Sequence, residues 1–209
     1  MAALVLSIAI PTYNRATYLA LTLDVLKKQL SDVPQGSVEI VVSDNASTDH
    51  TQEVIQAAIA GGLPVRAVRN EQNIGSDANI AQVFNLSAAP YVMILGDDDI
   101  LVDGTLRFLV ETARQGFGVI CLRPYGYNTD YRKEYPGDVG QDKVFESAGD
   151  FLAAIGAYMT LISACVVNKK LLGSVDARDY CGGNLVQVHL VVKASLMGKR
   201  NLYRTRYAV

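Results

Sequence analysis

The chain has 209 residues, of which 50% are hydrophobic and 19% are charged, so it is long enough to bury the core of one large domain. Its formal net charge of -2 provides no basic surface overall, which disfavours nucleic-acid binding. The three cysteines lie far apart without a CxxC pair, as expected for free thiols in a reducing compartment such as the cytoplasm.

The first half of the sequence alternates between short apolar runs and longer amphipathic stretches. Apolar runs predict buried strands, and apolar residues every three or four positions predict helices between them. In chain order, we expect strands at 4–10, 38–42, 64–68, 91–95 and 119–122. Between these strands, helices are expected at 15–30, at 76–86 with Ser76 as the N-cap, and at 101–113. A further helix should begin after Ser47 or Thr48, either of which can be its N-cap.

The second half begins with an irregular, tyrosine-rich segment at about 123–142, which is typical of a functional or mobile loop. A helix near 147–157, a strand at 161–168, a helix near 185–197 and a strand at 202–207 should follow. The run 151–168 has no charge over eighteen residues, near the lower limit for a membrane span. Its polar residues and strand-like second half favour a buried helix that leads into a buried strand.

Strands that alternate with helices predict an α/β fold, in which helices cover both faces of a mostly parallel sheet. Ligands of such sheets bind at the carboxyl ends of the strands. A polar cluster follows each of the first four predicted strands, at 12–14, 44–47, 70–75 and 97–99. Four clusters at one edge of the sheet predict a ligand site there.

The acidic run Asp97-Asp98-Asp99 directly follows a strand, where adjacent carboxylates repel one another. A divalent cation bound together with phosphate oxygens would relieve this repulsion. The alternative is a solvated acidic turn that only ends the strand. Asp44 also ends a strand and suits a base N–H or a ribose hydroxyl, although it can instead cap the next helix.

Several enzyme classes lack their characteristic motifs in this chain. Neither GxGxxG nor GxxxxGK[ST] occurs, which disfavours a dinucleotide dehydrogenase and a P-loop enzyme. His50 and His189 stand alone, without a serine or cysteine elbow beside them, so a hydrolase triad is not supported.

Four ordered segments resemble the family 2 glycosyltransferases with the GT-A fold, namely 7–15, 41–49, 73–75 and 95–99. The strings SDNASTD and GDDD are most similar to bacterial O-antigen sugar transferases of the abequosyltransferase type. The resemblance covers about residues 4–115. It implies a nucleotide-sugar donor, Mn2+ or Mg2+ as cofactor, and transfer of the sugar to an acceptor hydroxyl in bacterial surface polysaccharide synthesis.

The resemblance also implies the domain organisation. We expect a single GT-A domain over 1–209, with a nucleotide-sugar-binding half at 1–115 and a smaller, mixed acceptor-side half at 116–209. A sugar-phosphate nucleotidyltransferase shares the fold type, but it should carry a glycine-rich loop and a lysine where this chain has Pro11-Thr12-Tyr13-Asn14-Arg15.

Matched position by position, the resemblance assigns a set of donor residues. These are Pro11, Tyr13, Arg15, Asp44, Asn73, Gly75, Asn79, Asp97 and Asp98. Relatives often read Asp-x-Asp in the acidic motif, and Gly96 stands at the first Asp here. Asp98 then matches the metal-binding second Asp, with Asp99 as its neighbour, and it would serve catalysis through the metal. Relatives also often carry an arginine where Ala78 precedes Asn79.

The general base is the largest departure from the family pattern. Inverting relatives commonly place a Glu-Asp pair at the start of the late helix, and that pair falls on Val186-Gln187. Gln187 cannot act as a base. His189 is the candidate, although two positions along a helix turn a side chain by about 200°. Asp176, Asp179 or a chemistry without such a base remain as alternatives.

The resemblance finally implies a set of partners. A nucleotide-sugar donor and a saccharide or lipid-linked acceptor are expected, and nucleic acid is not. The protein should be cytoplasmic, with peripheral association at the inner face of the membrane and a homodimer as further expectations. Because the base is missing, a degenerate GT-A domain that binds nucleotide-sugar or a partner without turnover is the alternative function.

Overall fold

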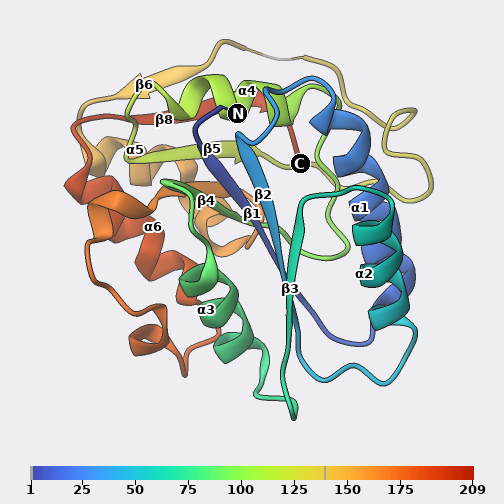
Figure 1. Ribbon diagram of the computed structural model, residues 1–209. Helices are drawn as coiled ribbons and strands as arrows, with labels where there is room; N and C mark the ends of the chain where they lie inside the picture. Colours follow the sequence, from blue (N-terminus) through green and yellow to red (C-terminus); the bar gives the residue numbers. More distant parts are fainter. Residues whose placement is uncertain (1, 139) are drawn as a thin grey trace.

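The structure is a computed structural model that describes residues 2–138 and 140–209. Its centre is a sheet with the strand order β3-β2-β1-β4-β7-β5-β8-β6, and helices cover both sides of it (Figure 1). This arrangement confirms the predicted α/β fold with a mostly parallel sheet.

The first half of the sheet is parallel throughout. It contains β1 (Leu6–Thr12), β2 (Val38–Asp44), β3 (Val65–Arg69) and β4 (Tyr91–Ile94). In the register of β1 and β2, Thr12 lies beside Asp44, so the polar ends of both strands reach the same edge. The predicted convergence of polar clusters therefore has a structural basis.

The second half of the sheet is mixed. β5 (Val119–Arg123) is parallel to β8 (Asn201–Tyr207), and the edge strand β6 (Lys143–Phe145) is antiparallel to β8. Between β4 and β5 lies β7 (Cys165–Asn168), antiparallel to both. The late strand β7 thus joins the two halves into one sheet.

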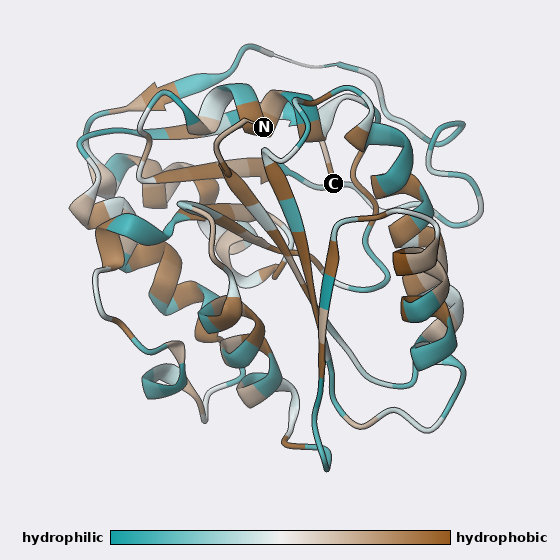
Figure 2. Cartoon of the chain, viewed as in Figure 1, coloured by the Kyte–Doolittle hydropathy of each residue, from teal (hydrophilic) through white to brown (hydrophobic). Residues whose placement is uncertain are grey.

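The helices divide evenly between the two faces. One face carries α1 (Ala16–Leu30), α2 (Thr51–Ala60) and α4 (Thr105–Ala113), whose apolar residues share a core with β1, β2 and β4. The other carries α3 (Ser76–Leu86), α5 (Ala148–Ile155) and α6 (Val186–Met197). Figure 2 shows the hydrophobic strands enclosed between these two layers.

The structure departs from the prediction at several elements, of which β1 is shifted by two residues, to Leu6–Thr12. α4 begins at Thr105 rather than Leu101, because 96–104 form a loop that ends at Gly104 with a φ of 83°. β7 begins at Cys165 rather than Leu161, after the 3-10 helix η1 (Gly156–Thr160). The strand β6 was not predicted, since it has three residues and no buried alternation that would mark it.

The predicted helix caps are also wrong. Within residues 2–138 and 140–209, no side chain caps α3, which Gly75 precedes, and Ser76 is already its first helical residue. Ahead of α2, Asp49 takes the role expected of Ser47 or Thr48, since its Oδ1 accepts a hydrogen bond from the Thr51 backbone N–H at 3.0 Å. The Ser47 hydroxyl instead accepts from the Asn14 N–H at 2.9 Å, which ties the ends of β1 and β2 together.

The uncharged run 151–168 forms part of α5, the helix η1 and β7, as the sequence predicts. Phe151 and Ile155 of α5 are buried in the core, and so are all four residues of β7. Among the helices of the described residues, none is both long enough and apolar enough to span a membrane.

The tyrosine-rich segment folds back on the loop that follows β4. Tyr131 is buried with Ile100 and Val25, and Tyr125 and Tyr127 pack against these three side chains. Glu134 stabilises the turn before it, because its carboxylate accepts hydrogen bonds from the N–H groups of Asn128, Thr129 and Asp130 at 2.8 to 2.9 Å.

We expect this turn to persist to unusually low pH. The three N–H groups lower the pKa of Glu134 to about 2, so its stabilising contribution is complete above the ordinary pKa of a glutamate and is lost only as the pH falls towards 2. In ¹H–¹⁵N NMR spectra, the amides of residues 128–130 should titrate near that value. Titration near pH 4.5 would contradict the hydrogen-bonded turn.

Candidate active site

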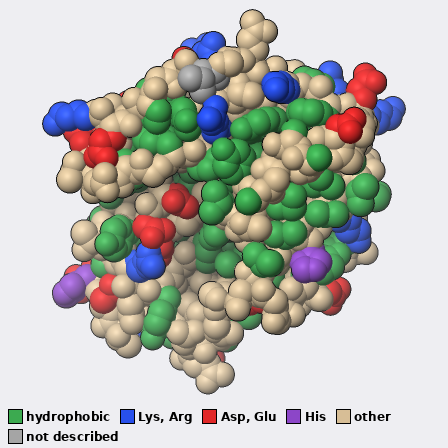
Figure 3. All heavy atoms as spheres, turned by 180° about the vertical axis from the view of Figure 1, so that it is seen from behind, with side chains coloured by type: hydrophobic (Ala, Val, Ile, Leu, Met, Phe, Trp, Pro, Cys, Tyr) green, Lys and Arg blue, Asp and Glu red, His purple; other side chains and the backbone are tan. Residues whose placement is uncertain are grey.

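A cavity of about 460 Å³ opens at the carboxyl edge of the sheet, beside the first turn of α3. The residues that line it come from the ends of β1, β2 and β4, from α3 and from two loops, and include Pro11, Thr12, Tyr13, Arg15, Asn45, Asn73, Ser76, Asn79, Ile80, Gly96, Asp97, Asp98, Asp99 and Ile162. On the face seen in Figure 3, acidic and basic side chains meet at a hollow beside a broad apolar surface.

The cavity collects most of the residues expected at a donor site. Pro11, Tyr13, Arg15, Asn73, Asn79 and the three aspartates line it. Gly75 is adjacent to its wall, with a φ of 88° that suits glycine, and its carbonyl accepts from the Asn45 amide at 3.3 Å. Asp44 and His189 are not among the lining residues.

The three carboxylates of the acidic motif point to different partners. Asp97 is buried and accepts a hydrogen bond from the Thr12 hydroxyl at 2.7 Å. Asp98 is half exposed and pairs with the Arg15 guanidinium, whereas Asp99 accepts from the Ser163 hydroxyl. Among residues 2–138 and 140–209, no three acidic, histidine or cysteine side chains come together as a complete metal cluster.

Two carboxylate oxygens nevertheless converge over Gly96. A Cβ placed on Gly96 would lie 2.7 Å from Asp99 Oδ2 and 3.3 Å from Asp98 Oδ1, so both oxygens reach the space that a side chain would fill. Mg2+ and Mn2+ are commonly held by one or two carboxylates, with substrate phosphates and water completing the coordination. The residues present therefore fit a partial cation site of this kind, and glycine at position 96 keeps it open.

The electrostatics of the motif also favour a cation. Burial raises the pKa of Asp97 and of Asp99, although hydrogen bonds from Thr12 and Ser163 oppose the shift. Among the described residues, the Arg15 guanidinium is the one cationic side chain that lines the cavity. Its pKa is raised mainly by the charge of Asp98 and next by that of Asp97. Three carboxylates beside one guanidinium leave negative charge that a metal ion would neutralise.

Ser163 is a site residue that the sequence did not reveal. Its hydroxyl accepts a hydrogen bond from the Gly96 N–H at 2.8 Å and donates to Asp99. Ser163 lies just before β7 and is buried, so it reaches the acidic motif only because β7 pairs with β4. No motif or spacing in the sequence indicates this contact.

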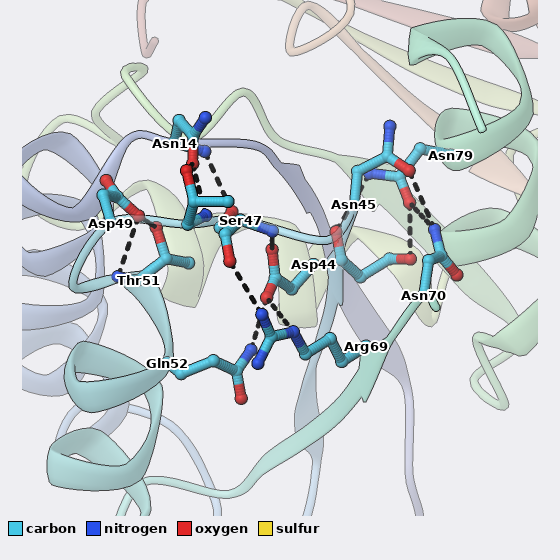
Figure 4. A network of polar contacts seen from close by, with 12 residues as sticks. Asn14, Asp44, Asn45, Ser47, Asp49, Thr51, Gln52, Arg69, Asn70 and Asn79 are labelled. Carbon is cyan, nitrogen blue, oxygen red and sulfur yellow. Dashed lines mark hydrogen bonds and ion pairs between the residues drawn. The ribbon is translucent and has the colours of Figure 1, made fainter. Parts of the chain in front are cut away.

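The Asp44 carboxylate is bound by neighbouring residues of the protein. Its side chain is fully buried, and its oxygens contact the Ser47 N–H at 3.0 Å, the Arg69 guanidinium at 3.6 Å and the Gln52 amide (Figure 4). These contacts account for both carboxylate oxygens. Binding of a nucleoside by Asp44 stays a prediction.

The neighbouring Asn45 reaches the cavity instead. Its amide donates to Asn73 Oδ1 at 2.8 Å, and its oxygen accepts from the Ile74 N–H at 2.9 Å and the Asn70 amide at 3.0 Å. Asn79 is held in a similar way, with its amide bonded to the Ser43 carbonyl at 2.9 Å. The close-up in Figure 4 shows Asn45, Asn70 and Asn79 linking the end of β2 to the loop after β3 and to α3.

The residues considered for a general base lie away from the cavity lining. His189 is exposed on α6, where its ring stacks on Tyr180 at 5.0 Å and its Nδ1 faces the Leu185 carbonyl at 3.2 Å. Asp176 bonds to Asn85 and also caps the 3-10 helix η3 (Ala177–Tyr180). The geometry lends His189 no support as a base, and its role stays a prediction.

Gln187 has a structural role at the start of α6. It is buried, its amide donates to the Thr160 carbonyl at 2.7 Å, and its Oε1 has no hydrogen-bond partner among the described residues. It also lines a small apolar cavity together with Leu161 and Leu190.

We expect Gln187→Glu to destabilise the protein, because a buried carboxylate would face the Thr160 carbonyl without a donor. The loss should be about 1 to 3 kcal/mol at neutral pH, measured by thermal unfolding. Gln187→Met, which removes the amide without adding charge, is the matched control and should cost less. Equal stabilities of the two variants would contradict this interpretation.

Comparison with known proteins agrees with the sequence motifs. Residues 7–175 match the family model described as Glycosyl transferase family 2. Abequosyltransferase RfbV of Salmonella typhimurium is 36% identical over 51% of this chain and 32% of its own length. The GalNAc(5)-diNAcBac-PP-undecaprenol beta-1,3-glucosyltransferase of Campylobacter jejuni is 30% identical over 71% of this chain and 48% of its own length. The chain thus spans about a third to a half of these relatives.

Solved structures support the same fold. TarS of Staphylococcus aureus in complex with UDP superposes with a TM-score of 0.74 at 21% identity, covering 98% of this chain and 59% of that one. The mannosyltransferase PcManGT of Pyrobaculum calidifontis in complex with GDP-Man and Mn2+ superposes with a TM-score of 0.64 at 17% identity, covering 96% of this chain and 56% of that one. The family model covers most of the chain, and the fold agrees along its length: this protein belongs to glycosyl transferase family 2.

Proposed function

We propose that this chain transfers a sugar from a nucleotide-diphosphate donor to an acceptor hydroxyl. The observation that carries the proposal is the convergence of Asp98 Oδ1 and Asp99 Oδ2 over Gly96, inside a cavity of a family 2 member. A donor diphosphate and a cation would together satisfy these oxygens, and the cavity of about 460 Å³ has room for them.

Asp98 and Asp99 would hold the divalent cation, Mn2+ or Mg2+. When bound, the cation would neutralise the charge that develops on the leaving diphosphate. The Mn2+ in the Pyrobaculum neighbour supports metal use in this fold.

The other lining residues suit the remaining parts of a donor. Tyr13 is 44% exposed, and its ring offers a face on which a nucleoside base can stack. Arg15 stays charged and lies where it can attract donor phosphates. Asn45, Asn73 and Asn79 have fixed side chains at the cavity wall, so they would orient the donor with little loss of conformational entropy.

The acceptor is proposed from the relatives. The Campylobacter enzyme is named for a saccharide carried on undecaprenyl diphosphate, which supports a lipid-linked saccharide as acceptor and peripheral contact with a membrane. Free thiols at Cys121, Cys165 and Cys181 suit the cytoplasm. A homodimer stays a prediction.

Calorimetry with UDP-, GDP- and dTDP-sugars, each with and without Mn2+, tests the donor assignment. We expect one nucleotide class to bind, with Mn2+ strengthening the binding, and a lipid-linked saccharide panel then to release the nucleotide in a turnover assay. Absence of binding by all three classes would overturn the proposal. Binding without turnover would point to the degenerate domain, which the transferases named among the relatives do not favour.

A further inference from the structure

A second cavity lies between the tyrosine-rich segment and the loop that carries the acidic motif. Its volume is about 270 Å³, and it is lined by Val102, Asp103, Tyr125, Tyr131, Arg132 and Tyr135. Asp103 is only four residues beyond Asp99, so one short loop borders both cavities.

The polar part of the cavity lining is a bidentate ion pair between Arg132 and Asp103. Arg132 Nε and Nη2 donate to the two oxygens of Asp103 at 2.8 and 3.0 Å, and the Tyr131 hydroxyl points to Asp103 Oδ1 at 3.4 Å. The Arg132 guanidinium also lies over the Tyr131 ring at 4.6 Å. These groups present hydrogen-bond donors and acceptors without net charge, which suits an uncharged polar ligand better than a phosphate.

The cavity is also lined by aromatic side chains. Tyr125 packs edge-on against Tyr135 at 5.8 Å and against Tyr207 at 5.6 Å. The Tyr125 hydroxyl donates to the Tyr131 carbonyl at 2.5 Å, so the rings are held in place. Aromatic side chains next to hydrogen-bonding groups match the surface of a pyranose, which has apolar C–H faces and a rim of hydroxyls.

The segment also lies close to the acidic motif. Tyr127 packs with Ile100, and the pKa of its hydroxyl is raised by burial first and then by the negative charges of Asp99 and Asp98. The second cavity and the site proposed for the donor thus border the same loop, which follows β4.

We propose that the cavity formed by Val102, Asp103, Tyr125, Tyr131, Arg132 and Tyr135 binds one pyranose unit of a saccharide acceptor. The role as acceptor subsite rests on the proposed transferase function, whereas the binding of a pyranose does not. Each monosaccharide contact of this kind is weak, so a dissociation constant of the order of millimolar is expected.

Titration of the ¹⁵N-labelled chain with the methyl glycosides of glucose, galactose, mannose and N-acetylglucosamine tests the site. We expect at least one of them to shift the amides of residues 102, 103, 125, 132 and 135. Arg132→Ala and Tyr135→Ala should each weaken that binding about fivefold or more. Arg107→Ala and Tyr158→Ala are the matched controls, since Arg107 forms an exposed ion pair with Glu111 and Tyr158 packs against Tyr203, both outside the cavity.

The outcomes separate this site from the donor site. The proposal is overturned if none of the four glycosides shifts these amides, or if the Arg132 and Tyr135 variants bind as tightly as their controls. Titration with UDP-, GDP- and dTDP-sugars plus diamagnetic Mg2+ should instead shift amides around 96–99. If the glycosides shift the amides of the second cavity but no nucleotide-sugar shifts the amides around 96–99, the transferase proposal fails and the pyranose site stands.

Discussion

Replacing Asp98 with asparagine should weaken Mn2+-dependent binding of the nucleotide-sugar by about 10- to 100-fold. The change replaces one of the two carboxylates that converge over Gly96 with a neutral amide, whose oxygen binds a hard divalent cation more weakly than a carboxylate does. The fold should persist, because the Asp98 side chain is 47% exposed and its ion pair with Arg15 lies at the surface, where such pairs contribute at most about 1 kcal/mol.

Calorimetry with the donor, with and without Mn2+, measures this effect. The matched control is Asp24→Asn, which removes an exposed carboxylate paired with Lys28 on α1, and it should leave donor binding unchanged. Unaltered Mn2+-dependent affinity in Asp98→Asn would remove Asp98 from the cation site. Loss of affinity equally with and without Mn2+ would assign Asp98 to the sugar or ribose instead.

The largest loss of stability is expected from Gly198→Ala. A Cβ on Gly198 would lie 2.6 Å from the Gly118 Cα and 2.9 Å from the Gly118 nitrogen, and backbone atoms at the start of β5 cannot rotate away. The end of α6 would have to move off the sheet. Overpacking of this kind costs about 1 to 3 kcal/mol of unfolding free energy, and we expect a value in the upper part of that range. The φ of -78° at Gly198 is ordinary, so the effect is steric rather than conformational.

Thermal unfolding measures the loss, and Gly149→Ala is the control. Gly149 lies in the first turn of α5, where the nearest atom to a new Cβ is 3.7 Å away, so alanine should stabilise the helix by up to about 1 kcal/mol. If both variants unfold at the same temperature, the close approach of α6 to β5 is not a constraint on the fold.

Much of the fold could be predicted because helices and strands alternate in this chain with clear periodicity. The apolar residues of α1 and the fully buried runs of β1 and β4 mark their elements directly. The place of β7 could not be predicted, because apolar pattern alone does not tell which strands pair. The helix caps failed for a related reason, since Ser47 and Ser76 are occupied by tertiary contacts or lie at the cavity.

The site was predictable where residues follow the first four strands, and less so elsewhere. Tyr13, Asn73 and Asp97–Asp99 come together because parallel strands end at one edge. Asp44 ends the same kind of strand, yet Arg69 from β3 and Gln52 from α2 enclose it, which only the assembled structure reveals. Ser163 and the second cavity depend on the later half of the chain folding back.

The insertion of β7 has a consequence for how the protein is made. During synthesis, β1 to β4 emerge first, but one edge of β4 stays unpaired until residues 165–168 leave the ribosome. Until then that edge can pair with other chains, and the Ser163 hydroxyl has not reached Gly96 or Asp99. The proposed cation site is therefore completed late, and its assembly coincides with the removal of the exposed edge.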